Sequence, residues 1–201
     1  SGNLIFMMTG FFMGLFIGAG IVIAQYFGAR NYEKVRSAVH TDIAFALCCG
    51  VLLTLLGVFF TPTILTWMRT PADVLSTSIL YFRLYFLGSL ATILYNAGMG
   101  ILQAVGDSRS PLYYLVISSV VNVALDLLFV GAMDMGVAGA AVATVISQVV
   151  SAVLCIIKLT RSDGPYRLEI KRIGFDLPLL KKITSQGVPS GVKNSIIAIA
   201  N

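Results

Sequence analysis

Charged residues are scarce in this sequence. Only 11% of its 201 residues are Asp, Glu, Lys or Arg, whereas 57% are hydrophobic and the mean hydropathy is +0.89. Soluble domains carry about 25% charged residues, so this composition excludes a soluble fold. It predicts a membrane protein with several spans.

Residues that catalyse reactions or bind metals are also few. The single histidine, His40, lies at the edge of a predicted span, and the three cysteines, Cys48, Cys49 and Cys155, fall in apolar segments. An odd number of cysteines within spans is typical of packing residues. There is no Ser/His/Asp set and no Gly-rich phosphate loop. We therefore expect no enzyme and no cofactor, and no nucleic-acid partner because the basic residues fall in the loops.

Long hydrophobic runs divide the chain into spans. Five runs exceed the roughly 20 residues that cross about 30 Å of hydrocarbon, and a sixth begins near residue 187. The five occupy residues 4–27, 43–66, 74–104, 111–131 and 137–159. The predicted fold is an all-α, polytopic transmembrane helix bundle. Because the chain begins almost inside one run and stops inside another, we expect a piece of a longer protein.

The distribution of Lys and Arg over alternating loops predicts the orientation. Loops 28–42, 105–110 and 158–182 hold eleven of them, whereas loops 67–73 and 131–136 hold one. The first group is expected in the cytoplasm, as in a multi-pass protein of the cell (inner) membrane. Residues 162–186 are expected to form a basic cytoplasmic linker with a short amphipathic segment, which lies on the membrane surface or joins two helical bundles.

Two local patterns predict helix contacts and helix ends. Gly10, Gly14 and Gly18 recur every four residues, as on a face where two membrane helices meet closely. Ser110 followed by Pro111 is typical of a capping serine at the start of a helix.

Asp126 is the most informative residue, because it lies inside the apolar run 111–131. A carboxylate at the centre of a membrane helix costs roughly 2.5–3.5 kcal/mol even on lenient scales. Asn122 lies one turn earlier on the same face and supplies an amide. This pair predicts a proton or cation site. The alternatives are a structural pairing with Arg83 and exposure near the outer boundary.

Thr144 is expected at a similar depth on the next, antiparallel helix. Its hydroxyl, the Asn122 amide and the Asp126 carboxylate would form an oxygen-rich cluster that suits Na⁺, or a proton with water. No other metal site is expected. The alternative for Thr144 is a hydroxyl that bonds to the backbone of its own helix.

Five motifs then appear in order along the chain. They are AQYFGA at 24–29, GILQAVGDSRSP at 100–111, NVALD at 122–126, GVAGAAVAT at 136–144 and GVPSG at 187–191. Together they resemble the multidrug and toxic compound extrusion (MATE) family. The resemblance covers essentially the whole chain.

The resemblance implies a transporter of twelve helices in two six-helix lobes. Residues 1–161 would be the second to sixth helices of the N-terminal lobe, and residues 187–201 the start of the second lobe. The implied function is secondary active efflux, in which Na⁺ or H⁺ is exchanged for small organic, often cationic, drugs. The implied cation or proton site contains Asn122, Asp126, Thr144 and Tyr81; the substrate-binding residues stay unknown. The implied partners are the drugs, the lipid bilayer and the second lobe.

Two other functions stay open. A lipid-linked oligosaccharide flippase of related architecture carries anionic cargo and needs inward-facing basic residues, for which only Arg83 and Lys193 are candidates. A non-transporting membrane module would not need a buried Asn-x-x-x-Asp pattern.

Overall fold

The computed structural model describes residues 2–200, with side chains for residues 10–197. This part of the chain contains helices and no strand, which confirms the all-α prediction. The helices are α1 (Gly2–Gly28), α2 (Tyr32–Trp67), α3 (Ala72–Ala104), α4 (Arg109–Asp126), the π-helix η1 (Leu127–Ala132), α5 (Gly136–Arg161), the 3-10 helix η2 (Ile170–Arg172) and α6 (Leu177–Ala200). Five of them, α1 to α5 (α4 together with η1), are long and apolar enough to cross a membrane, as predicted.

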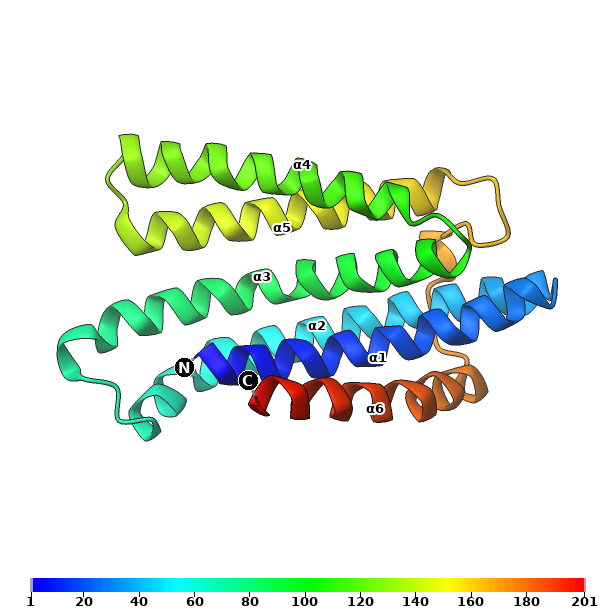
Figure 1. The fold of residues 1–201 in the computed structure, drawn as a ribbon, viewed down its shortest axis with the longest axis horizontal. Coiled ribbons are helices and arrows are strands. Elements are labelled where there is room, and N and C mark those ends of the chain that lie inside the picture. The colour runs from blue at the N-terminus through cyan, green and yellow to red at the C-terminus, as the bar shows by residue number, and fades with distance from the viewer. Residues whose placement is uncertain (1, 201) are drawn as a thin grey trace.

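The helices lie roughly parallel to one long axis, and consecutive helices run in opposite directions (Figure 1). The α4–α5 pair forms one edge, α3 packs between this pair and α2, and α6 packs along α1. The three basic loops all lie at one end of the bundle, on the right of Figure 1. Which side of the membrane this end faces stays a prediction.

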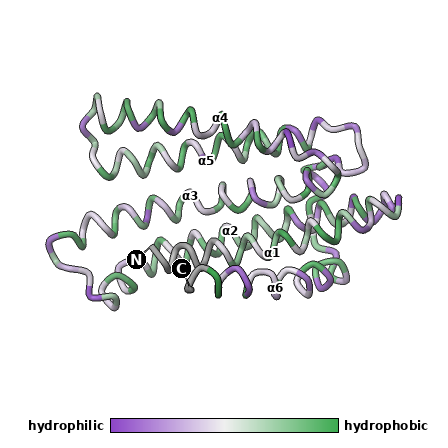
Figure 2. The backbone as a smooth tube through the Cα atoms, viewed as in Figure 1, coloured by the Kyte–Doolittle hydropathy of each residue, from purple (hydrophilic) through white to green (hydrophobic). Residues whose placement is uncertain are grey.

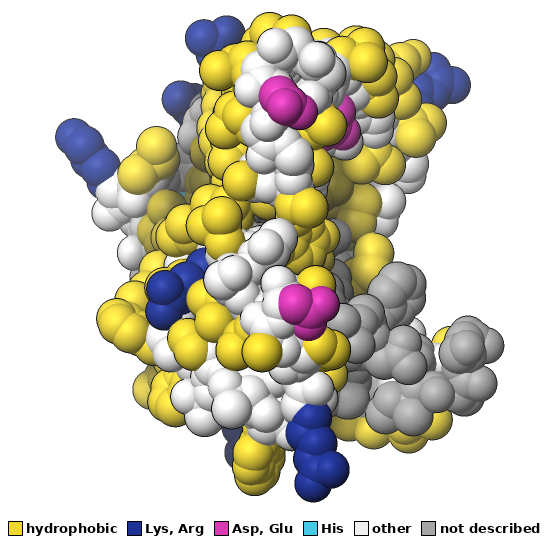
Figure 3. Space-filling view, turned by 90° about the vertical axis from the view of Figure 1, so that its left-hand side faces the viewer, with side chains coloured by type: hydrophobic (Ala, Val, Ile, Leu, Met, Phe, Trp, Pro, Cys, Tyr) yellow, Lys and Arg dark blue, Asp and Glu magenta, His cyan; other side chains and the backbone are white. Residues whose placement is uncertain are grey.

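The bundle has an apolar core and an apolar outside. Fully buried side chains from α2, α3 and α5, such as Ile43, Ile101 and Leu159, form the core. Hydrophobic residues continue along the outer faces of the helices (Figure 2). The end where α2 meets α3 and α4 meets α5 shows hydrophobic and uncharged atoms, with scattered acidic and basic side chains (Figure 3). Apolar surface on both sides of a helix is typical of lipid-facing bundles.

The predicted glycine face of α1 is a close helix contact, and its partner is α6. A Cβ atom added to Gly14 would overlap the backbone of Gly191, and one added to Gly18 would overlap the backbone of Gly187. We call these four residues the glycine seam. Without side chains between them the two backbones touch, which is how small residues stabilise helix pairs in lipid.

The start of α4 is capped by a different residue from the one predicted. Asp107 accepts two hydrogen bonds from Ser110, one from the backbone N–H over 3.0 Å and one from the hydroxyl over 2.6 Å. The prediction of a capping serine at Ser110 is therefore wrong. The carboxylate of Asp107 caps the helix instead, because its two oxygens accept hydrogen bonds from the backbone N–H and the hydroxyl of Ser110 at the same time.

The connection between α5 and α6 is shorter than expected. Helix α6 begins at Leu177, so residues 177–186 are helical and continue directly into the segment that was expected to start near 187. The remaining connection, residues 162–176, is called the linker below. At the other boundary, α2 begins at Tyr32, so most of the loop expected at 28–42 is helical too.

The linker is held against the start of α2 by two hydrogen bonds. The backbone N–H of Glu169 donates to His40 Nε2 over 3.0 Å, and the backbone N–H of Asp176 donates to Thr41 Oγ1 over 3.2 Å. The other ring nitrogen of His40 lies 2.7 Å from the carbonyl oxygen of Arg36. The single histidine therefore fixes the linker to the bundle.

Candidate functional site

Helices α4 and α5 carry three of the four predicted site residues. Ser118 Oγ donates a hydrogen bond of 2.6 Å to the carbonyl oxygen of Ser147, which fixes the register of this antiparallel pair. Because both helices rise by the same amount per residue, Thr144 lies near the level of Asn122. Asp126 lies about one turn closer to the α4–α5 turn.

Asn122 and Asp126 are both half-buried on α4. The Nδ2 atom of Asn122 and the Oδ1 atom of Asp126 are shielded from solvent, and neither has a hydrogen-bond partner among the described residues. A buried polar atom without a partner costs about 1–3 kcal/mol, and native structures hold few of them. One turn of α4 thus offers a free donor and a free acceptor to a third group.

Thr144 and Tyr81 are not joined to this pair. Thr144 Oγ1 donates to the carbonyl oxygen of Ala140, one turn earlier in its own helix, over 2.9 Å. The ring of Tyr81 stacks on Tyr85 of α3, with centroids 6.4 Å apart. In the described part of the chain, no hydrogen bond links either residue to Asp126. Their membership of the site stays a prediction.

Arg83 does not neutralise Asp126. Its Nε donates to the backbone carbonyl of Val58 on α2 over 3.3 Å, and its side chain is exposed. The two ion pairs found between described residues involve other acids. The structure therefore does not contain the pairing that was the main structural alternative for Asp126.

A π-helix begins directly after Asp126. The backbone changes from α-helix to the wider π form over Leu127–Ala132, with Asp126 at the boundary. Such π segments are rare and occur frequently at functional sites. No residue pattern in the sequence signals this change, and the sequence analysis missed it.

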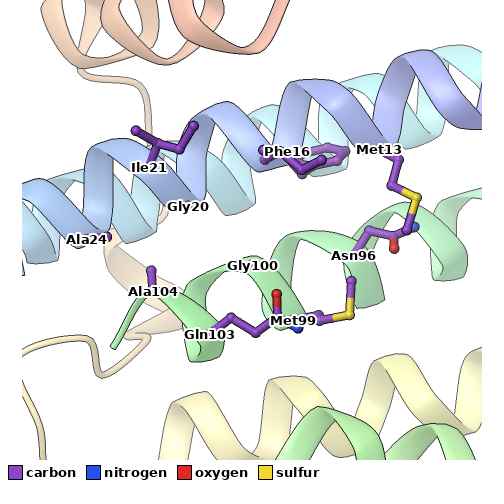
Figure 4. Close-up of a pocket in the computed structure, with 11 residues that line it drawn as sticks. Met13, Phe16, Gly20, Ile21, Ala24, Asn96, Met99, Gly100, Gln103 and Ala104 are labelled. Carbon is purple, nitrogen blue, oxygen red and sulfur yellow. The ribbon is translucent and has the colours of Figure 1, made fainter. Parts of the chain in front are cut away.

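A groove of about 470 Å³ lies between α1 and α3 (Figure 4). Its lining is mainly apolar, with the amides of Asn96 and Gln103 as polar side chains; the other lining residues are Met13, Phe16, Ile17, Gly20, Ile21, Ala24, Met99, Gly100 and Ala104. Grooves of this size with a few polar groups are typical of small-molecule sites. The sequence analysis named no substrate-binding residue.

A polar cluster occupies the turn between α3 and α4, on the basic end of the bundle. Burial raises the pKa of Asp107, but the hydrogen bonds from Ser110 and the positive charge of Lys158 outweigh it, so the pKa is lowered from its ordinary value. Lys158 Nζ of α5 lies 3.9 Å from Asp107 Oδ2. This ionised carboxylate connects the α3–α4 turn, the start of α4 and the end of α5 at the basic end of the bundle.

Five membrane-length helices and a glycine seam define a helical membrane protein. A partnerless carboxyl–amide pair inside a span is typical of ion and proton pathways in such proteins. A family model described as MatE matches residues 1–128. The probable multidrug resistance protein YoeA of Bacillus subtilis (strain 168) is 32% identical, over 98% of this chain and 44% of its own length. This chain belongs to the MatE family, which confirms the resemblance stated above.

Solved structures support the same assignment. An inward-facing structure of a multidrug resistance MATE family transporter matches with a TM-score of 0.90, and an outward-facing one with 0.89. Each is 26% identical to this chain and covers 98% of it, whereas the chain covers 45% and 44% of those structures. The chain thus spans less than half the length of its relatives. It is a multi-pass membrane protein, and membership of a transporter family confirms that it is not an enzyme.

Proposed function

We propose that this chain is the N-terminal part of a secondary active multidrug antiporter that exchanges Na⁺ or H⁺ for small organic, often cationic, drugs. The observation that carries the proposal is the Asn122–Asp126 pair, whose buried Nδ2 and Oδ1 atoms have no partner in the described part of the protein. A carboxyl group held in a membrane helix without a partner binds a cation or a proton. The relatives are named as probable multidrug resistance proteins, which supports export as the direction of transport and drugs as the substrates.

The coupling follows from the two states of Asp126. When a proton or Na⁺ neutralises the carboxylate, the free-energy cost of burying it disappears and α4 packs against its neighbours without a penalty. When the site is empty, the charged carboxylate favours an arrangement that gives it water or a cationic drug. Alternating access requires only that the two arrangements bind ion and drug with different affinities.

The two lobes are expected to move as units around this site. The chain fits an inward-facing and an outward-facing relative almost equally well, which favours a lobe that changes little inside during the cycle. A second six-helix lobe, supplied by the rest of the full-length protein, would complete the drug pathway. The coverage of 44–45% of the relatives supports this second lobe.

The α1–α3 groove is suited to an apolar or aromatic drug. None of its lining residues carries a charge, and the amides of Asn96 and Gln103 can form hydrogen bonds with a ligand without adding charge to the groove. An anionic oligosaccharide lipid would need basic groups there. The two basic candidates for that role, Arg83 and Lys193, both have exposed side chains and do not line the groove.

Efflux from proteoliposomes of the full-length parent tests the proposal. A fluorescent organic cation is loaded, and a Na⁺ gradient and a pH gradient are imposed separately. We expect one gradient to drive export, and Asp126→Asn to abolish it. The matched control is Asp134→Asn, because Asp134 is exposed in the α4–α5 turn and its backbone φ of 52° also suits Asn. Normal export by an inserted Asp126→Asn protein would exclude Asp126 as the coupling site.

A further inference from the structure

Asp42 is the most deeply buried acid among the described residues. Its side chain is 1% exposed, whereas Asp126 is half-buried. Asp42 lies on α2 one turn from Ala38, Val39 and Ala46, which belong to the apolar core of the bundle. Its carboxyl group therefore points into the core.

Neither oxygen of this carboxyl group has a hydrogen-bond partner in the described part of the chain. Titratable groups on α1, α2 and α3 do not neutralise it. Cys49 lies two turns further along α2, Tyr26 of α1 receives a hydrogen bond from Lys182 of α6 over 3.3 Å, and Tyr95 of α3 donates to a backbone carbonyl over 2.8 Å. No basic side chain forms an ion pair with Asp42.

The charged groups of the linker are also engaged elsewhere. The carboxylate of Glu169 pairs with Arg172 over 2.8 Å. The carboxylate of Asp176 accepts a hydrogen bond from the backbone N–H of Leu179 over 3.3 Å at the start of α6. An ionised carboxylate at Asp42 would thus be buried and uncompensated, which costs several kcal/mol.

A proton is the ligand that relieves this cost. A metal ion needs several donors, and no group of three His, Cys, Asp or Glu residues lies close enough together in the described range. A protonated carboxyl group carries no charge and needs no counter-ion. The geometry around Asp42 suits one bound proton.

The linker covers the route from Asp42 to the cytoplasm. The two residues that precede Asp42, His40 and Thr41, accept the two hydrogen bonds that hold the linker to α2. Leu159 of α5 accepts a third from the backbone N–H of Leu168 over 3.0 Å. Leu168 of the linker and Leu179 of α6 are buried in the same apolar cluster as the start of α2. If the linker left α2, the end of the bundle next to Asp42 would open to water.

We propose that Asp42 is a second proton-binding carboxyl group of this protein, loaded from the cytoplasmic side and covered by the linker. It is separate from the Asn122–Asp126 pair, which lies near the opposite end of the bundle. The proposal does not depend on Asp126 being the coupling site. It adds a proton site at the position where the connection between the two expected lobes meets the membrane helices.

Infrared difference spectroscopy of the full-length parent in lipid tests the proton site. At neutral pH, subtraction of the Asp42→Asn spectrum from that of the parent should give the carbonyl band of a protonated carboxyl group. Both proteins carry Asp126→Asn, which removes the acid of the other proposed site. Asp42→Glu should shift this band and replaces the Asn variant if the latter does not accumulate. A pair of carboxylate bands in place of the carbonyl band overturns the proposal, whatever the efflux assay gives.

Hydrogen–deuterium exchange of the same band tests the cover. In the parent the band should shift slowly in D₂O, because the linker excludes water. The double variant His40→Ala/Thr41→Val removes both acceptors and should speed the shift at least tenfold, while the matched surface variant Thr160→Val should leave it unchanged. An equally slow shift in the double variant contradicts the role of the linker.

Discussion

The glycine seam makes a sharp prediction for Gly14→Ala. The added methyl group would overlap backbone atoms of Gly191 and Ser190, and a backbone cannot turn aside as a side chain can. Helices α1 and α6 must therefore separate, and overpacking of this kind costs about 1–3 kcal/mol. The matched control is Gly28→Ala, because no atom lies within 4 Å of its added methyl group. In a helix this exchange contributes up to about 1 kcal/mol of stability.

The assay measures the reactivity of the buried Cys155 thiol. Cys155 of α5 is 0% exposed and packs against Gly98 of α3, so a fluorogenic maleimide reacts with it only after the bundle opens. With Cys48, Cys49 and any other cysteine of the full-length parent replaced by Ser, heating should give one labelling transition. The chain covers 44% of a relative's length, so the full-length parent is expected to be more than twice as long as this chain. At about 2.1 cal/mol/K of unfolding entropy per residue, about 1–3 kcal/mol then corresponds to a midpoint roughly 1–3 °C lower.

The comparison is between the two alanine variants. Gly14→Ala should melt below the parent or close to it, and Gly28→Ala should melt at or above the parent. If Gly14→Ala melts as high as Gly28→Ala, the two backbones do not touch in the membrane and the reasoning from the seam is refuted.

Two further predictions concern the basic end of the bundle. His40→Ala leaves the N–H of Glu169 without its acceptor, at a cost of about 1–3 kcal/mol; this amide should exchange with D₂O faster, about tenfold or more, by mass spectrometry, and unchanged exchange would contradict the docking. The pKa of Asp107 is lowered in the folded state, so its contribution to stability is present above the ordinary value of 3.8 and is lost as the pH falls through the lowered folded-state pKa. The melting midpoint of the parent should fall in that acid range, and Asp107→Asn should remove that part of the pH dependence.

The sequence predicted the spans and the glycine face well, because both depend on local patterns. Runs of apolar residues longer than the hydrocarbon thickness leave few alternatives to a membrane helix. Glycines spaced by four residues lie on one helix face whatever the partner is. The sequence did not identify the partner, since that depends on which distant helix returns to α1.

Non-local contacts explain what the sequence did not predict. Asp42 fell in an expected loop and attracted no attention. It is buried because the start of α2 is helical and because the linker, more than a hundred residues later, docks on His40 and Thr41. The cap at Asp107 was missed for a simpler reason. Serine and aspartate both cap helices, so the sequence did not show that Asp107, three positions before Ser110, would accept both hydrogen bonds that Ser110 donates.

The π-helix after Asp126 gives α4 a way to turn without unfolding. A π segment holds one more residue per turn than the α-helix around it. If that extra residue moved along α4 by one turn, the residues it passed would rotate by about 100° and advance by about 1.5 Å, with the backbone hydrogen bonds re-formed behind it. Asp126 lies at the boundary where such a rotation would begin, so its carboxyl group would be carried toward another face of the helix. Neutralising the carboxyl group of Asp126 would then set the rotation of this segment of α4 about its own axis.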